Sequence, residues 1–360
     1  MKNRRQFLQA IAALSALPLT SCGWRLGSVR SAPISTPSDQ LYLFTWTQYS
    51  DQELLDTFTT QTGIKVSVDI YDSNEVMLAK ILAGGGSGYS LIYPSDYMVE
   101  RMIEENLLRE INHDRLIGLN NLFPEFQNPS YDPNNRHSIP FNWGTTGFIY
   151  DSAQLPDAPT DWEYLWQNQD RLNRRITLLN DVREVMGAVL RMLGYSYNSQ
   201  NLEEVRQAYQ KLVTLKPAIA SFSTDAWQNQ LLAGDLTLAM CYSADAIRVI
   251  QENPRFKYII PHSGSSLWTD TIVIPQTAPN VDGAYAWINF MLQPEVAASI
   301  SKRLSLATPN MAGFEQLPPE IQNNPSWFPP QEILDKCERI QPLGDFEEVY
   351  ERYWTKLTIS

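Results

Sequence analysis

Cysteine and histidine are scarce in this sequence, which contains only three of each among 360 residues. So few cysteines cannot define a disulfide framework, and Cys241 and Cys337 either pair with each other or remain buried and reduced. The histidines His113, His137 and His262 show no metal-ligand spacing with one another or with cysteine. We therefore expect no metal site, and nothing in the sequence indicates a cofactor.

The N-terminal apolar stretch, from Phe7 to Leu19, is too short for a membrane span, which takes roughly 20 residues. It follows Lys2, Arg4 and Arg5, and this order is typical of a signal peptide. The pair Arg4-Arg5 followed by Gln-Phe-Leu resembles a twin-arginine signal, although ordinary secretory signals carry such arginines too. We expect export to the periplasmic space, and the export route stays open.

A cysteine follows this apolar stretch directly, in the motif Leu19-Thr20-Ser21-Cys22. The motif resembles a bacterial lipobox, in which small residues fit the peptidase and the cysteine thiol receives a diacylglyceryl group. We predict a signal peptide over residues 1–21, a lipid anchor at Cys22 that holds the protein at the inner membrane, and a flexible tether over 22–39. The alternative is a plain signal peptide with an incidental cysteine.

Positive charge is in the minority, with 28 Lys and Arg against 40 Asp and Glu and a net charge of −12. The leader holds three of the cations and no acid, so the exported body is more acidic than the whole chain. Such a body repels nucleic acid and favours cationic ligands. It is also long enough for two domain-sized cores, at roughly 100 to 200 residues each.

Hydrophobic periodicity predicts an α/β fold. The body begins with strands at 41–45, 64–70 and 89–93, separated by a helix carrying Leu54, Leu55 and Phe58 and by one at 76–83. Further strands are predicted at 146–150, 176–179, 236–241 and 258–260, and helices at 162–167, 183–193, 201–214, 225–233, 244–251, 282–303 and 346–357.

This alternation predicts two lobes, each a mostly parallel sheet flanked by helices, with a hinged cleft between them. We place the first lobe at 40–143 plus 269–314 and the second at 144–268 plus 315–360. Ligands of such folds bind where strands end and helices begin. The segments at these points are 46–49, 94–97, 181–184, 243–245 and 268–270.

Aromatic and acidic side chains gather at these strand ends. An ammonium ligand that loses its water needs carboxylates in exchange, because an unpaired buried charge costs several kcal/mol. Aromatic faces cover methylene groups and attract the ammonium by cation–π contact, at about 0.5 to 2 kcal/mol each. An organic cation is therefore the predicted ligand of Trp46, Tyr49, Tyr97, Tyr242 and Trp268 together with Asp181, Glu184 and Asp270.

Six short motifs follow one another along the body: Trp46-Thr47-Gln48-Tyr49, Tyr93-Pro94-Ser95-Asp96-Tyr97, Ile139-Pro140-Phe141-Asn142-Trp143-Gly144, Asp181-Val182-Arg183-Glu184, Trp268-Thr269-Asp270 and Thr308-Pro309-Asn310. In this order they resemble the periplasmic spermidine/putrescine-binding proteins of ABC transporters, over nearly the whole body. The resemblance implies a monomeric binding protein rather than an enzyme. Such a protein captures a polyamine and delivers it to the membrane permease.

The resemblance also implies roles for single residues. Asp181 and Glu184 would hold one amine region, Trp268 would stack along the methylene chain, and Asp270 would pair with an ammonium. The full set of implied ligand contacts is Trp46, Thr47, Gln48, Tyr49, Ser95, Tyr97, Asp181, Glu184, Thr224, Tyr242, Trp268, Asp270 and Gln341.

Three positions depart from the family pattern. Gln48 stands where spermidine-binding members carry a glutamate, Tyr242 replaces an expected tryptophan, and Leu306 replaces an expected tyrosine. The pocket thus loses one carboxylate and one hydroxyl. The choice among putrescine, spermidine and longer chains therefore stays open.

Other interpretations remain. Asp181 and Glu184 are also spaced as a capping box at a helix start, which is a structural role. The same fold could bind a sugar, an amino acid or another cation, since a fold alone does not choose its ligand. A glycosidase-like enzyme would instead use two carboxylates, such as Asp181 and Asp270, as acid and base.

Overall fold

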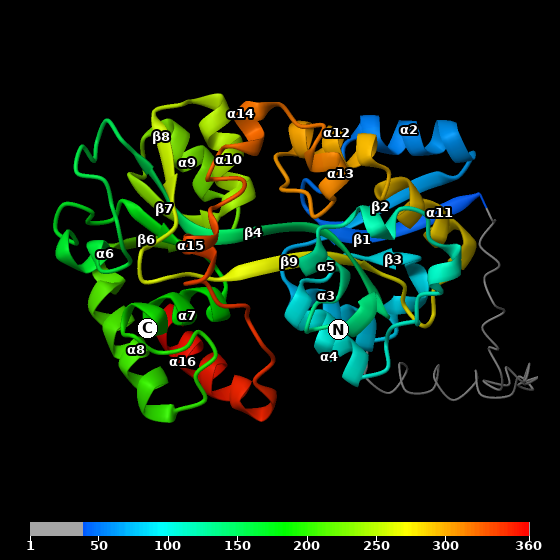
Figure 1. Ribbon diagram of the computed structural model, residues 1–360. Coiled ribbons are helices and arrows are strands. Elements are labelled where there is room, and N and C mark those ends of the chain that lie inside the picture. The colour runs from blue at the N-terminus through cyan, green and yellow to red at the C-terminus, as the bar shows by residue number, and fades with distance from the viewer. Residues whose placement is uncertain (1–38, 360) are drawn as a thin grey trace, which may run out of the picture. The chain divides into compact units, whose positions relative to one another are not determined.

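The computed structural model describes residues 39–359 (Figure 1). The predicted signal peptide, the predicted anchor at Cys22 and the tether up to residue 38 lie outside the described residues. In the described part of the chain, no helix is both long and apolar enough to cross a bilayer.

The first lobe begins with the predicted βαβαβ pattern, which the structure confirms. Helix α2 starts where the Asp51 carboxylate accepts a hydrogen bond from the amide of Leu54, and it ends at Gly63, whose φ of 75° suits glycine. Strand β1 pairs in parallel with β2 and β3. The elements are β1 (Gln40–Trp46), α2 (Gln52–Thr62), β2 (Lys65–Tyr71), α3 (Asn74–Leu82), β3 (Leu91–Ile92) and α4 (Asp96–Glu104).

Two antiparallel strands, β4 (Ser138–Asp151) and β9 (Leu267–Val273), cross between the lobes (Figure 1). The first part of β4 pairs with β9, and its second part pairs with β7 (Leu238–Tyr242) and β8 (Phe256–Ile259). The sequence indicated only residues 146–150 of β4 and placed Trp268 and Asp270 beside a strand rather than inside one. Every residue of β4 is buried, so the strand has no polar alternation that would mark its length.

The second lobe packs helices around β5, β6 and β7, with β5 parallel to both neighbours. Its β6 was not predicted, and the predicted helix at 346–357 is α16 (Glu347–Ile359), which packs on α7 and α8. The elements are α6 (Tyr164–Gln167), β5 (Ile176–Leu178), α7 (Val182–Met192), α8 (Leu202–Leu215), β6 (Ile219–Phe222), α9 (Trp227–Ala233), β7 (Leu238–Tyr242), α10 (Ser243–Glu252) and β8 (Phe256–Ile259).

After β9 the chain returns to the first lobe, where α11 packs on α2 and β1. The single helix predicted at 282–303 is two helices, because Pro294 lacks an amide hydrogen and begins a new helix at its first turn. The remaining elements are α5 (Pro124–Gln127), α11 (Val281–Met291), α12 (Pro294–Leu304), α13 (Met311–Phe314), α14 (Pro319–Gln322), α15 (Gln331–Leu334) and 3-10 turns at Gly85–Gly88, His113–Arg115, Leu119–Asn121, Pro133–Asn135, Lys216–Ala218 and Gly344–Phe346.

The sheet order is β2-β1-β3-β9-β4-β7-β5-β6, with β8 beside β4. Each lobe therefore has parallel outer strands, and the pairs made by β4 and β9 are antiparallel. This arrangement confirms the predicted two-lobed α/β fold. The prediction of mostly parallel sheets holds for the outer strands of each lobe and does not hold for the pairs that β4 and β9 make.

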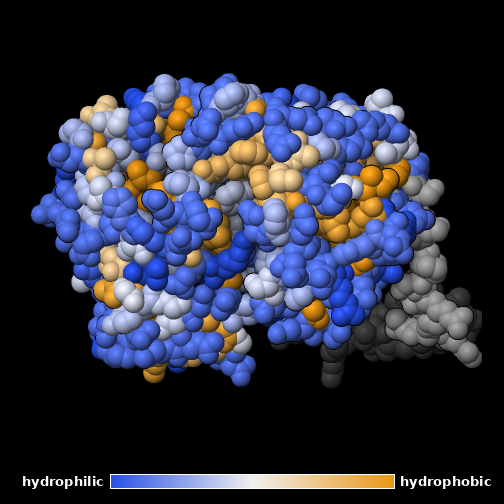
Figure 2. All heavy atoms as spheres, in the orientation of Figure 1, coloured by the Kyte–Doolittle hydropathy of each residue, from blue (hydrophilic) through white to orange (hydrophobic). Residues whose placement is uncertain are grey.

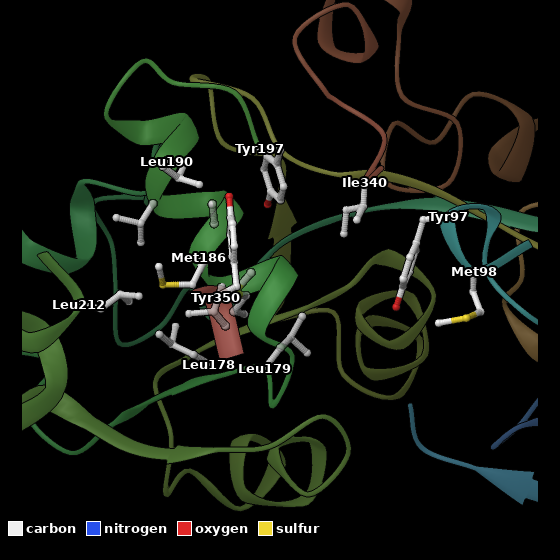
Figure 3. Close-up of a cluster of buried hydrophobic side chains, with 14 of the residues drawn as sticks. Tyr97, Met98, Leu178, Leu179, Met186, Leu190, Tyr197, Leu212, Ile340 and Tyr350 are labelled. Carbon is white, nitrogen blue, oxygen red and sulfur yellow. The ribbon is translucent and has the colours of Figure 1, made fainter. Parts of the chain in front are cut away.

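Buried side chains form a large cluster that fills the second lobe and reaches the first (Figure 3). Figure 3 shows Leu178, Met186, Leu190 and Tyr350 gathered from β5, α7 and α16, with the side chain of Tyr97 apart from them. Burying each such side chain stabilises the fold by about 1.5 to 3 kcal/mol.

The two cysteines of the described chain are free thiols. Cys241 is buried in β7 and Cys337 is half-buried. Burial raises the pKa of both thiols, so neither side chain favours the reactive thiolate. Of the two alternatives that the sequence left open, the unpaired one is what the structure contains.

Candidate functional site

A pocket opens between the lobes and encloses about 840 Å³ of space, part of which is open to solvent. In Figure 2 the visible face is hollowed between the lobes, in the lower half of the view. Its walls come from the ends of β1, β2 and β7, from β9, and from the starts of α3, α4, α7 and α10. The convergence of strand ends and helix starts is the geometry expected for a ligand site of an α/β fold.

The pocket brings together most of the residues predicted from the sequence. The predicted residues in its wall are Trp46, Thr47, Tyr49, Ser95, Tyr97, Asp181, Glu184, Thr224, Tyr242, Trp268 and Asp270. The lining residues that were not predicted as single ligand contacts are Tyr71, Asp72, Asn74, Asp96, Asp225, Ala244, Asp245, Arg248 and Ile340, although Asp96, Ala244 and Asp245 lie in the predicted strand-end segments 94–97 and 243–245.

Two predicted residues, Gln48 and Gln341, do not line the pocket. Gln48 is exposed in the turn after β1, with a φ of 68°. Gln341 is also exposed, and its carbonyl accepts a hydrogen bond from Arg183 Nη1 at 3.0 Å, while its neighbour Ile340 lines the pocket instead. Leu306, one of the departures from the family pattern, is buried in the hydrophobic core of the first lobe.

Asp270 is a buried carboxylate of the pocket that two hydroxyl groups hold. Its Oδ1 accepts a hydrogen bond from Ser95 Oγ at 2.6 Å, and its Oδ2 accepts one from the Tyr49 hydroxyl. Asn142 Nδ2 in turn donates to that hydroxyl at 3.0 Å. Burial raises the pKa of Asp270 to about 7, although the two donated hydrogen bonds oppose the shift. This carboxyl is poised to lose its proton when a cation approaches.

Asn74, at the start of α3, organises the wall of the first lobe. Its Nδ2 donates to Ser95 Oγ at 3.0 Å and to the Tyr97 hydroxyl at 3.1 Å. The Tyr97 hydroxyl donates to Glu75 at 2.9 Å. These bonds fix the orientation of Ser95 and Tyr97 before any ligand is present.

Asp181 and Glu184 supply the acidic wall of the second lobe. Asp181 caps α7, because its Oδ1 accepts from the amides of Arg183 and Glu184 at 2.9 and 3.0 Å. The second half of a capping box is missing: both Glu184 carboxylate oxygens accept from Ser266 Oγ instead, at 2.9 and 2.7 Å. Burial, followed by the negative charge of Asp181, raises the pKa of Glu184 to about 8.

Aromatic rings form the opposing walls. Trp46 packs against Tyr71 with centroids 4.7 Å apart, and Trp268 meets Tyr242 edge to face at 5.7 Å. The Trp268 indole lies where β4 carries Gly144, since a Cβ on that glycine would come within 2.5 Å of the ring. The pocket wall therefore combines aromatic rings with carboxylates, the two kinds of group that bind an organic ammonium.

Comparison with known proteins assigns the chain to a family. Residues 53–330 match the model of the bacterial extracellular solute-binding proteins. The chain belongs to this family. It is 36% identical over 328 residues to the spermidine/putrescine-binding periplasmic protein of Salmonella typhimurium, covering 91% of this chain and 94% of the relative.

Solved structures agree with the family. A structure from Listeria monocytogenes is 37% identical with a TM-score of 0.84, covering 89% of this chain and 98% of its own. The TpPotD lipoprotein of Treponema pallidum is 27% identical with a TM-score of 0.80, covering 89% and 100%. The two-lobed fold of this solute-binding protein is thus the periplasmic-binding-protein fold.

This solute-binding protein has a second acidic region in its pocket, whose residues were not predicted as ligand contacts. Asp72 follows β2, Asp225 precedes α9, and Asp245 lies in the first turn of α10, where it pairs with Arg248. Burial raises the pKa of Asp245 to about 6. Asp72 directly follows a predicted strand, and Asp245 lies in the predicted strand-end segment 243–245. Their places at strand ends were the only feature of the sequence that could have indicated a role in ligand binding.

No group of three or more His, Cys, Asp or Glu side chains within residues 39–359 is arranged to hold a metal ion. Among the pocket carboxylates, Asp270 and Glu184 accept hydrogen bonds from hydroxyl groups, and Asp96 and Asp245 pair with arginines. The arrangement can neutralise and desolvate an organic cation.

Proposed function

We propose that this chain is the substrate-binding component of an ABC importer and that it captures polyamines such as putrescine and spermidine. The observation that carries the proposal is the position of Asp270: a buried carboxylate, held by Ser95 and Tyr49, in a pocket walled by Trp46 and Trp268. The 36% identical relative from Salmonella typhimurium, named a spermidine/putrescine-binding protein, supports the same ligand class.

The charge balance of the pocket favours a polycation. Its described lining holds seven carboxylates and a single basic residue, Arg248. Two of these carboxylates are already paired, Asp96 with Arg339 and Asp245 with Arg248. Within residues 39–359 the other five have no Lys, Arg or His nitrogen at ion-pair distance. An anion would meet net repulsion here, and a neutral sugar would leave the buried carboxylates uncompensated.

In this proposal the lining residues predicted from the sequence contact the ligand. Asp270 pairs with one ammonium group, Asp181 and Glu184 with another, and Trp268 covers the methylene chain between them. Gln48 and Gln341 stay predictions without a place in the pocket wall.

The proposed mechanism is closure of two lobes around the ligand, with boundaries at 143/144, 268/269 and 314/315. The first two boundaries face each other in the β4–β9 ladder, where Trp143 pairs with Thr269 and Gly144 with Trp268. A bend there would move both strands together, as hinge closure requires. The ligand would favour the closed form by bridging Asp270 and Tyr97 on one side to Asp181 and Tyr242 on the other.

Cellular context forms a further part of the proposal. We propose export by the segment 1–21, a periplasmic location, lipid attachment at Cys22, monomeric function and delivery to the permease of the importer. The related Treponema pallidum protein, named a lipoprotein, supports the anchor. Labelling cells with a radioactive fatty acid checks it: the label should appear on the wild-type protein and be absent from Cys22→Ala.

The test of function is a thermal-shift panel with putrescine, spermidine, spermine, sugars and amino acids, followed by calorimetry. We expect amines alone to stabilise the protein, with smaller shifts at higher salt. Asp270→Asn should weaken binding by roughly tenfold to a hundredfold, which is the loss of one charge-assisted contact. Asp56→Asn, an exposed change on α2 outside the pocket, is the control.

The enzyme alternative has a distinct outcome. Chromatography of the amine and of oligosaccharides after long incubation should return them unchanged, because a binding protein captures its ligand without conversion. Cleaved sugar products, or tight binding of a sugar in the absence of any amine response, would overturn the proposed function.

A further inference from the structure

Arg248 is the one basic residue among the described residues that line the pocket. It lies on α10, one turn after Asp245, and its Nη2 donates to the Asp245 carboxylate. Its Nη1 donates to the carbonyl of Leu304 at 3.1 Å, at the C-terminal end of α12. Carbonyls at a helix C-terminus carry partial negative charge, so two separate elements hold the guanidinium in place.

A second contact fixes the same region. Ser305 Oγ, directly after α12, donates to Gln251 Oε1 on α10 at 3.0 Å. The Arg248 side chain is about one-fifth exposed and that of Asp245 is less so. The position of Arg248 at the pocket wall is therefore set by hydrogen bonds that join α10 to the end of α12 as well as by its ion pair with Asp245.

The guanidinium sits among acids that would otherwise attract a cationic ligand. Asp72 and Asp225 line the same pocket as Asp245. Burial raises the pKa of Asp225, the negative charge of Asp72 adds to the rise, and the positive charge of Arg248 opposes it. A fixed guanidinium takes the place that a ligand ammonium would occupy, and it repels a second cation that approaches.

We propose that Arg248 is a specificity-determining residue, which occupies the acidic region made by Asp72, Asp225 and Asp245 and so disfavours ligands that carry a third ammonium group. This inference rests on the proposed function and adds a substrate preference to it. Amine charges are confined to the region of Asp270, Asp181 and Glu184, which suits a short diamine such as putrescine. Spermidine would have to place its additional ammonium beside the guanidinium.

The test compares dissociation constants for putrescine and spermidine by calorimetry at one ionic strength. In Arg248→Gln, affinity for spermidine should rise relative to putrescine by roughly tenfold, because Asp245 loses its paired cation and the positive charge that opposes Asp72 and Asp225 is removed. Arg248→Lys keeps the charge and should keep the wild-type ratio. Arg206→Gln is the matched control: it also breaks an i,i+3 helical ion pair, with Glu203, but on the exposed surface of α8.

Asp245→Asn separates a specificity role from a structural one. It breaks the same ion pair but leaves Arg248 without its partner, so it should lower the affinity for spermidine relative to putrescine. A merely structural ion pair would move both variants in the same direction. Thermal melting of each variant without ligand shows whether it folds.

The possible outcomes distinguish failure of this inference from failure of the proposed function. A ratio for Arg248→Gln equal to that of Arg206→Gln, or a shift of Asp245→Asn in the same direction as Arg248→Gln, overturns this inference and leaves polyamine binding intact. Failure of the wild-type protein to bind any amine overturns the proposed function, and the inference falls with it. Opposite shifts of the spermidine-to-putrescine affinity ratio in Arg248→Gln and Asp245→Asn support both the proposed function and this inference.

Discussion

Arg339 and Asp96 form an ion pair in which Arg339 Nη1 lies 2.6 Å from Asp96 Oδ2. The same nitrogen donates to Thr269 Oγ1 at 2.8 Å. The pair thus ties the segment that precedes α16 to the start of α4 and to β9. Asp96 is only 2% exposed, and burial raises its pKa, although the guanidinium of Arg339 opposes the shift. Arg339 is thus the charged partner of Asp96, and backbone hydrogen bonds from Tyr97 and Thr269 also favour the charged form.

Removing the Arg339 side chain should destabilise the folded protein. Arg339→Gln leaves a buried carboxylate uncompensated, and we expect the free energy of unfolding to fall by about 2 to 4 kcal/mol. Urea denaturation followed by circular dichroism measures it. Arg136→Gln breaks an exposed pair with Glu110 and should change stability by less than about 1 kcal/mol. Equal losses in the two variants would show that the burial of Asp96 has no energetic consequence.

The free energy of unfolding of the ligand-free protein should fall as pH rises. The folded pKa values of Asp245, Asp270 and Glu184 are raised to about 6, 7 and 8, above those of an unfolded chain. Below about pH 4 these groups are protonated in both states. Above about pH 4 the unfolded state has released these protons while the folded state still holds them, so the free energy of unfolding falls as pH rises, by about 2 kcal/mol or more in total, and levels off once pH has passed the folded pKa values near 6, 7 and 8.

Denaturation at intervals between pH 5 and 9 checks this trend, and Glu184→Gln isolates one contribution. The variant cannot ionise at this position, so its stability should fall less than that of the wild type between pH 6 and 9. Parallel curves for the two proteins would mean that Glu184 keeps an ordinary pKa when folded.

The sequence predicted the two-lobed fold and the residues around Asp270 well. It predicted less of the crossing strands and of the second acidic region, which consists of Asp72, Asp225 and Asp245. Trp268 and Asp270 were identified from an ordered series of motifs, and both line the pocket. The full length of β4 was missed because a strand buried throughout shows no alternation. Asp72 and Arg248 come from different lobes, and only the tertiary arrangement brings such residues into one pocket wall. Ile340, and not Gln341, lines it because a one-residue shift in an irregular segment reverses which side chain faces inward.

Polyamine binding near pH 7 should release protons. An ammonium beside Asp270 or Glu184 favours the charged carboxylate and lowers a pKa that burial had raised. Calorimetry in buffers of different ionisation enthalpy gives the number of protons released, which should be positive and smaller in Asp270→Asn. Affinity should also rise between pH 6 and pH 8. Proton uptake on binding would contradict the assignment of these carboxylates to the ligand site.

Gly144 allows the Trp268 wall to form, and its substitution offers a test that adds no charge. A Cβ at this position would come within 2.4 Å of Ser243 Oγ and 2.5 Å of the Trp268 ring, distances at which one of them must move. In Gly144→Ala the indole should be displaced, polyamine affinity should fall by roughly tenfold or more, and tryptophan fluorescence should change its response to ligand. Gly88→Ala is the control, since no atom lies within 4 Å of its added Cβ and its φ is not positive. If Gly144→Ala bound polyamines as tightly as Gly88→Ala, the indole would not be a wall that the ligand needs, and Asp270 with its hydroxyl partners would have to account for recognition alone.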